Sequence, residues 1–263
     1  MFVDVHAHMD FEEYMNHKID VDATIKNCEH KNVVAIVSQG VDIDSNRKVL
    51  ELSSKYKIVK AALGIYPLNC YEMITNGKQE DFDKEISFID AQLKQKKAVA
   101  IGEVGLDYKE VDPTENNKKI MKDCLRKFIE LAKRHDVPII LHSRKAEFEL
   151  IDFLEQEGMK GKKVIMHCFS GRKHHVQRVK NNGWFITVPA SVVKTEHFQY
   201  IARDVPLSQL LTETDSPYLS PDSKSINNPS NVILAIKKIA EIKKMNEEEV
   251  ANIIYNNYQK LFL

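Results

Sequence analysis

Met1-Phe2-Val3-Asp4-Val5-His6-Ala7-His8 is the stretch around which the chain is organised. Its apolar run begins almost at the first residue and has the character of a buried strand. On an extended strand His6 and His8 point to the same side, because side chains two residues apart share a face. Two imidazoles that face one way indicate a metal site, provided that other ligands reach them from elsewhere in the chain.

Seven further apolar runs with strand character follow, at residues 33–38, 58–63, 98–101, 138–141, 163–166, 184–188 and 209–212. They are almost continuously apolar, as are strands covered on both faces. Helical periodicity marks residues 44–55, 81–96, 115–135, 147–157, 174–181, 231–244 and 247–262, the last with Asn246 as its N-cap. Strand followed by helix, repeated, closes most naturally into a barrel, so we predict an α/β fold with one (β/α)8 TIM-barrel domain over residues 1–263.

A doubly wound open sheet is the alternative architecture. Its usual nucleotide signature is missing, because no G-x-G-x-x-G follows the first strand. No G-x-x-x-x-G-K-[ST] occurs either. The sequence therefore favours the barrel.

Charge and composition restrict the partners and the compartment. Lys plus Arg and Asp plus Glu number 38 each, so the chain lacks the basic excess of many nucleic-acid binders and would have to hold a polyanion locally. The N-terminus lacks a signal-peptide pattern, and no apolar run approaches the roughly 20 residues that span a bilayer. The four cysteines form no C-x-x-C motif. We expect a cytoplasmic protein without a membrane partner or an obligate protein partner, and the absence of heptads is consistent with a monomer.

Ionisable side chains gather where the predicted strands end, which is where chemistry takes place in a (β/α)8 barrel. The strand-end residues are His6 and His8 on the first strand, Glu103 on the fourth, His142 on the fifth, His167 on the sixth and Asp215 on the eighth. One or two polar residues at loop starts are ordinary. Six at one barrel mouth would be costly without a cation to compensate them.

This ligand set indicates divalent metal ions. Imidazole and carboxylate suit Zn, Mn and similar ions, and six ligands exceed what one tetrahedral ion takes, so we predict two ions per chain. Glu103 can bridge them because a carboxylate has two oxygens. Asp215 serves as a ligand, as the group that orients the metal-bound water, or as its proton acceptor. The predicted reaction is hydrolysis by a metal-activated water, with Glu103 and Asp215 as catalytic residues.

Six motifs in this order resemble those of the TatD family of metal-dependent deoxyribonucleases. They are His6-Ala7-His8, Gly64-Ile65-Tyr66-Pro67, Ile101-Gly102-Glu103-Val104-Gly105-Leu106-Asp107-Tyr108, Leu141-His142-Ser143-Arg144, His167-Cys168-Phe169-Ser170-Gly171 and Glu213-Thr214-Asp215-Ser216-Pro217-Tyr218-Leu219. The resemblance runs from residue 6 to the C-terminus. It implies an amidohydrolase-like TIM barrel.

The resemblance also implies a ligand assignment and an activity. By similarity, one ion would be held by His6, His8, Glu103 and Asp215, and the other by Glu103, His142 and His167. Family members use Mg, Mn or Zn. Their usual activity is 3′ to 5′ exonucleolytic cleavage of DNA, and some members act on RNA ends or on D-aminoacyl-tRNA.

Two departures from the family concern the substrate. Tyr66 stands where members commonly carry His, and Ile226-Asn227-Asn228-Pro229 stands where they carry Arg-Asn-Glu-Pro. The lost Arg and Glu remove polar contacts near the expected substrate mouth and leave the metal site untouched. The alternative function is therefore hydrolysis of another ester or an amide, such as D-aminoacyl-tRNA. A non-enzymatic, metal-stabilised scaffold ranks third, because structural Zn sites are usually closed and Cys-rich.

Three residues beside these motifs are candidates for substrate binding. Arg144 could clamp a phosphate through its planar pair of donors, or it could pair with a loop carboxylate. Tyr66 and Tyr218 are candidates for base stacking. Trp184 lies inside an apolar run and is expected in the core, and the basic run 172–175 is interpreted as solvated charge at a helix start.

Overall fold

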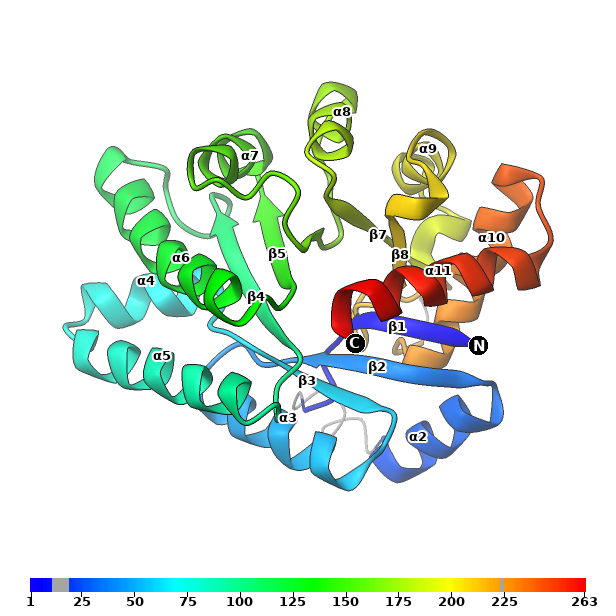
Figure 1. The fold of residues 1–263 in the computed structure, drawn as a ribbon, viewed down its shortest axis with the longest axis horizontal. Helices are drawn as coiled ribbons and strands as arrows, with labels where there is room; N and C mark the ends of the chain where they lie inside the picture. Colours follow the sequence, from blue (N-terminus) through cyan, green and yellow to red (C-terminus); the bar gives the residue numbers. More distant parts are fainter. Residues whose placement is uncertain (11–18, 223–224) are drawn as a thin grey trace.

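Eight parallel strands form one sheet in chain order in the computed structural model, which describes residues 1–10, 19–222 and 225–263. The strands are β1 (Phe2–Ala7), β2 (Val33–Gln39), β3 (Val59–Leu63), β4 (Ala100–Asp107), β5 (Ile139–Arg144), β6 (Val164–Met166), β7 (Phe185–Pro189) and β8 (Leu210–Glu213). They alternate with helices in a nearly closed barrel (Figure 1). The predicted TIM-barrel fold is confirmed.

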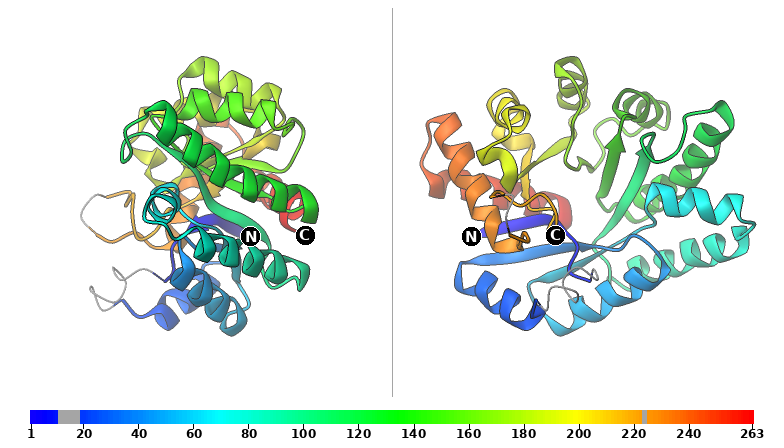
Figure 2. Two further views of the ribbon diagram at one scale, coloured as in Figure 1. Left: turned by 90° about the vertical axis from the view of Figure 1, so that its left-hand side faces the viewer. Right: turned by 180° about the vertical axis from the view of Figure 1, so that it is seen from behind.

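The helices lie outside the strands around the ring (Figure 2). They are α2 (Val21–His30), α3 (Ile43–Lys55), α4 (Pro67–Thr75), α5 (Gln79–Lys94), α6 (Glu115–His135), α7 (Glu147–Gln156), α8 (Lys173–Asn181), α9 (Glu196–Asp204), α10 (Val232–Lys243) and α11 (Glu247–Phe262), with short 3-10 turns η1 (Ala190–Val193), η2 (Leu207–Gln209) and η3 (Pro229–Asn231). The predicted helices lie within a few residues of these bounds. Helices α2, α4 and α9, which are among the shorter ones, were not predicted from the sequence.

Helix ends and faces follow from the sequence. Thr114 caps α6 by accepting from the backbone N–H of Asn117, and Asn246 caps α11 by accepting from that of Glu248. The apolar stripe of α6 is buried, including Phe128. Trp184 is also fully buried, and its indole N–H donates to the carbonyl oxygen of Met159, 2.9 Å away, so it belongs to the core as expected.

Strand β4 differs from the prediction in its length. It continues past residue 101 to Asp107, so Glu103 lies inside the strand rather than at its end. Two glycines interrupt the apolar run that would have revealed this. At Gly105 a Cβ atom would lie 2.0 Å from the carbonyl oxygen of His142, so glycine allows β4 to run close to β5 there.

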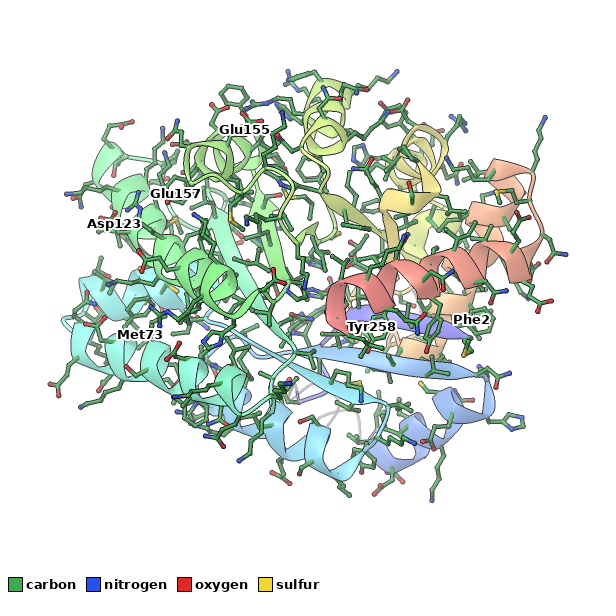
Figure 3. The ribbon with its side chains drawn as sticks, in the orientation of Figure 1. Phe2, Met73, Asp123, Glu155, Glu157 and Tyr258 are labelled. Atoms are coloured by element: carbon green, nitrogen blue, oxygen red, sulfur yellow. The ribbon has the colours of Figure 1, made fainter. Side chains whose placement is uncertain are left out.

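The last strand meets the first at the site-bearing end of the barrel. The backbone N–H of Asp215 donates to the carbonyl oxygen of His6 (2.9 Å), and that of His8 donates to the carbonyl oxygen of Ser216 (2.7 Å). At the other end of β8, Asn257 on α11 donates to the carbonyl oxygens of Leu207 and Leu210. Helix α11 lies beside both β1 and β8, and Figure 3 labels Tyr258 on α11 and Phe2 on β1. No helix of the described residues combines the length and the apolar character needed to cross a bilayer.

Candidate metal centre

The imidazoles of His6, on β1, and of His8, directly after β1, point into the barrel mouth as expected. The Nε2 atoms of His6 and His8 are 3.2 Å apart. Each lies 3.5 Å from Oε2 of Glu103 and 3.4 Å from Oδ1 of Asp215. The loop after β8 positions Asp215, whose backbone adopts φ +57°, a conformation that Asp tolerates better than most residues.

A second group of ligand atoms meets the other oxygen of Glu103. Nδ1 of His142 lies 2.8 Å from Oε1 of Glu103, and Nε2 of His167 lies 4.0 Å from the same oxygen. Nε2 of His167 is also 3.8 Å from Oδ1 of Asp215, and its ring stacks on that of His6 with 3.4 Å between centroids. Glu103 therefore faces both groups, one oxygen to each.

The residues fit divalent metal ions. Three sets, each with its ligand atoms within 4.8 Å of one another, are His6-His8-Glu103, His6-His167-Asp215 and Glu103-His142-His167. Nδ1 of His6 is buried without a hydrogen-bond partner among the described residues, so its Nε2 is the only ring atom with close polar neighbours. Imidazole nitrogens and carboxylate oxygens at this spacing are the ligand chemistry of Zn and Mn.

Charge in this buried cluster shifts the pKa values of its members. Burial acts to raise the pKa of Glu103, but hydrogen bonds from His142 and His6 outweigh it and hold that pKa well below its usual value. Burial acts to lower the pKa of His167, but the carboxylates of Glu213 and Asp215 outweigh it and raise the pKa to about 10. Both shifts favour the positively charged state around Glu103 and His167, whereas burial and the neighbouring His167 lower the pKa of His6.

Two further carboxylates, which were not predicted from the sequence, contact His142 and His167. Each contacts the ring nitrogen that points away from Glu103. Oδ2 of Asp107 lies 2.9 Å from Nε2 of His142, and Oε2 of Glu213 lies 2.7 Å from Nδ1 of His167. Both carboxylates are fully buried. A buried carboxylate on the far nitrogen fixes the tautomer and orientation of an imidazole ligand. The sequence could have indicated both carboxylates, because Asp107 lies in the same motif as Glu103 and Glu213 in the same motif as Asp215.

A cavity of about 900 Å³ opens over the cluster, and the three predicted substrate residues line it. The hydroxyl of Tyr66 donates to Oδ2 of Asp107 (2.8 Å), and Tyr218 is 42% exposed. Arg144 forms an exposed ion pair with Glu110 (3.1 Å), so the structure shows the second of its two proposed contacts. Lys194, Phe198 and Ser191, which follow β7, also line the cavity and were not predicted.

Cys168 does not lie on strand β6. It directly follows His167, and alternation along a strand would turn its thiol to the opposite side from that imidazole. Strand β6 ends at Met166, however, and Cys168 adopts φ +41°, so alternation does not apply to it. Cys168 is half-buried and lines the same cavity.

The altered segment 226–229 folds onto the loop that carries Asp215. The side-chain amide of Asn227 donates to the carbonyl oxygens of Thr214 and Tyr218, both at 2.8 Å. Oδ1 of Asn228 accepts from the backbone N–H of Ser230. Asn227 therefore holds the loop that carries Asp215, whereas Asn228 caps the start of η3.

Comparison with known proteins supports the resemblance seen in the sequence. The family model described as TatD related DNase matches residues 3–263. A Bacillus subtilis protein named uncharacterized metal-dependent hydrolase YabD is 30% identical over 266 residues, which are 100% of this chain and 99% of that protein. Human deoxyribonuclease TATDN3 is 30% identical over 264 residues, covering 99% and 94% of the two chains.

A solved structure has the same fold. The crystal structure of YJJV, a TatD homolog from Escherichia coli, superposes with a TM-score of 0.83 at 26% sequence identity, covering 99% of this chain and 97% of that one. The family match spans nearly the whole chain and agrees with the buried His and carboxylate cluster. The chain therefore belongs to the TatD-related DNase family and is a metal-dependent hydrolase.

Proposed function

We propose that this protein is a deoxyribonuclease that removes nucleotides from the 3′ end of DNA with two divalent ions, Mg, Mn or Zn. One observation carries the proposal: Glu103 presents Oε2 to the imidazoles of His6 and His8, and Oε1 to those of His142 and His167. A single carboxylate between two ligand groups is the arrangement that bridges a pair of ions. The name of the human relative supports DNA as the substrate.

Each residue has a definite role in this proposal. His6, His8, Glu103 and Asp215 would hold one ion, and Glu103, His142 and His167 the other. When bound, the ions supply the positive charge that activates water and offsets charge developing on the phosphate. Asp215 lies 15% exposed at the cavity and accepts the proton of the attacking water.

Side chains around the cavity bind the strand end. Arg144 on β5 and Lys194 after η1 both line the cavity, so each offers a cation to a phosphate of the strand. The guanidinium of Arg144 is 45% exposed in its pair with Glu110, and exchanging that partner for a phosphate costs little. Tyr66 and Tyr218 provide aromatic surface for the terminal base.

Cleavage of single-stranded DNA by metal-stripped protein tests the proposal. The substrate is labelled at its 5′ end, and Mg, Mn or Zn is added back separately. We expect a ladder of strands shortened stepwise from the 3′ end, which needs a metal and is lost in the Glu103→Ala, Asp215→Ala double variant. Absence of cleavage with every ion, from protein that binds two ions per chain, would contradict the nuclease assignment.

Hydrolysis of another ester, such as D-aminoacyl-tRNA, is the second candidate. It is favoured by segment 226–229, where no charged side chain occurs and both asparagines are engaged within the loop. Under this assignment the same metal-loaded protein deacylates D-aminoacyl-tRNA and leaves single-stranded DNA intact.

A further inference from the structure

A second hollow adjoins the metal cavity. It has a volume of about 380 Å³ and is lined by the start of α7 and the start of α8, which are neighbours in the ring (Figure 1). Ser170 lines both this hollow and the metal cavity. A chain that leaves the metal cavity past Ser170 therefore enters the hollow directly. We call it the α7–α8 hollow.

An exposed aromatic ring stands in the α7–α8 hollow. Phe148 is 55% exposed, which is unusual for so large an apolar side chain. Its ring lies 5.9 Å from that of His175, and the guanidinium of Arg178 lies 5.4 Å from its centroid. Arg178 is itself held by Asp152 (2.6 Å) and by Glu155, which Figure 3 labels on α7. The ring is thus supported by neighbours while much of its surface remains open to solvent.

The start of α8 is basic where a helix normally favours acidic residues. Its N-cap is Arg172, followed by Lys173, and the first turn contains no acidic residue. Nδ1 of His175 accepts a hydrogen bond from the backbone N–H of Arg172 (3.2 Å), and burial lowers the pKa of His175, so the positive charge belongs to Arg172 and Lys173. Positive side chains at a helix N-terminus oppose the helix dipole. A bound anion would relieve this repulsion.

Two cations of the hollow have no carboxylate partner. Lys145 and Arg172 are exposed, and neither forms an ion pair within the part of the chain that the structure describes. Neither carboxylate of the hollow pairs with these two cations: Glu149 pairs with lysines of α6, and Glu147 accepts from the hydroxyl of Ser170 (2.6 Å), which also lines the hollow. Free positive charge therefore flanks the open ring of Phe148.

We propose that the α7–α8 hollow binds the single-stranded DNA that continues from the scissile phosphodiester, with a base stacked on Phe148 and backbone phosphates at Lys145 and Arg172. Exposed aromatic rings combined with cations are the usual means of holding single strands without sequence preference. This inference rests on the proposed nuclease function and adds a subsite to it. It also explains how a chain of balanced charge holds a polyanion locally.

Binding of single-stranded DNA by metal-free protein tests the subsite apart from catalysis. Fluorescence anisotropy with a labelled twelve-nucleotide strand is expected to show affinity weakened about tenfold in Phe148→Ala, from the loss of one stacked base. Phe148→Trp retains the affinity because it keeps an aromatic face. The Lys145→Ala, Arg172→Ala double variant binds more weakly and with a shallower salt dependence. Lys127→Ala, an exposed cation on α6, serves as the matched control and leaves binding unchanged.

Cleavage by the metal-loaded protein separates this inference from the nuclease proposal. In Phe148→Ala we expect kcat/KM to fall for the twelve-nucleotide strand and to stay unchanged for bis(p-nitrophenyl) phosphate, which is too small to reach the hollow. Wild-type cleavage that Phe148→Ala does not alter, or equal weakening of single-stranded and duplex binding, would overturn the subsite. If the wild type cleaves no phosphodiester, the nuclease proposal fails, and the binding comparison alone decides the subsite.

Discussion

Buried carboxylates decide how His142 and His167 face the candidate metal centre. His142 turns Nδ1 toward Glu103 because its Nε2 is bound to Asp107, whereas His167 turns Nε2 inward because its Nδ1 is bound to Glu213. Burial acts to raise the pKa of Asp107, but hydrogen bonds from His142 and Tyr66 outweigh it and lower the pKa. Asp107 is therefore a charged carboxylate that fixes the orientation of the His142 ring.

Replacing Asp107 with Asn tests this role. The amide keeps the size of the side chain but removes the charge that fixes the His142 ring, so we expect metal affinity to fall about 10- to 100-fold. Calorimetric titration of metal-stripped protein measures the change, and circular dichroism checks the fold. Glu110→Gln is the control, because Glu110 contacts Arg144 instead. Affinity equal to that of the wild type would show that Asp107 does not orient the ligand.

Helices α3 and α5 are joined by a buried polar contact that also supports the site. Arg47 donates two hydrogen bonds of 2.6 Å to Glu85, which is 2% exposed. Asn46 donates to the same carboxylate and to the carbonyl oxygen of Gly64, and its own Oδ1 accepts from the Gly64 N–H. This network fixes the backbone two residues before Tyr66.

Arg47→Met is expected to destabilise the fold by about 3 kcal/mol, because it leaves the Glu85 charge buried without its main partner. Chemical denaturation measures the loss. The Arg47→Met, Glu85→Gln double variant should recover part of the stability, since it removes the stranded charge and keeps an acceptor for Asn46. A double variant no more stable than Arg47→Met would contradict this explanation.

At the scale of the whole molecule, the candidate metal centre joins strands from opposite parts of the barrel. Its side chains come from β4 and β5, from β1 and the residue that follows it, and from the loops after β6 and β8. The unfolded chain cannot bring these groups together, so a bound ion favours the folded state.

Adding metal should therefore raise the melting temperature. At an ion concentration of 100 times Kd the folded state gains about 2.7 kcal/mol. For a chain of this size that corresponds to a Tm increase of roughly 5–10 °C. Calorimetry with and without a chelator measures the shift. Glu103→Gln, which keeps the shape but weakens the bridge, should show a much smaller increase, and an equal shift in both proteins would place the ions elsewhere.

The sequence by itself determined the barrel and the six residues that the structure brings together. Alternating apolar runs and helical periodicity are local properties, and residues at the ends of parallel strands share one end of a barrel. For the same reason the bounds of α6 and α11 agree with their predicted ranges. The metal-binding role of the six residues remains a prediction.

Only the tertiary structure decided which carboxylates contact the candidate ligands and which side chains line the neighbouring hollow. Asp107 and Glu213 contact imidazoles that come from other strands or from the loops after them, and Glu103 lies inside a strand whose apolar run is interrupted by glycines. Phe148 and Arg172 line one hollow because α7 and α8 are neighbours in the ring. Such contacts join residues far apart in the chain. The local pattern of the sequence does not predict these contacts, because they depend on how neighbouring helices and strands pack.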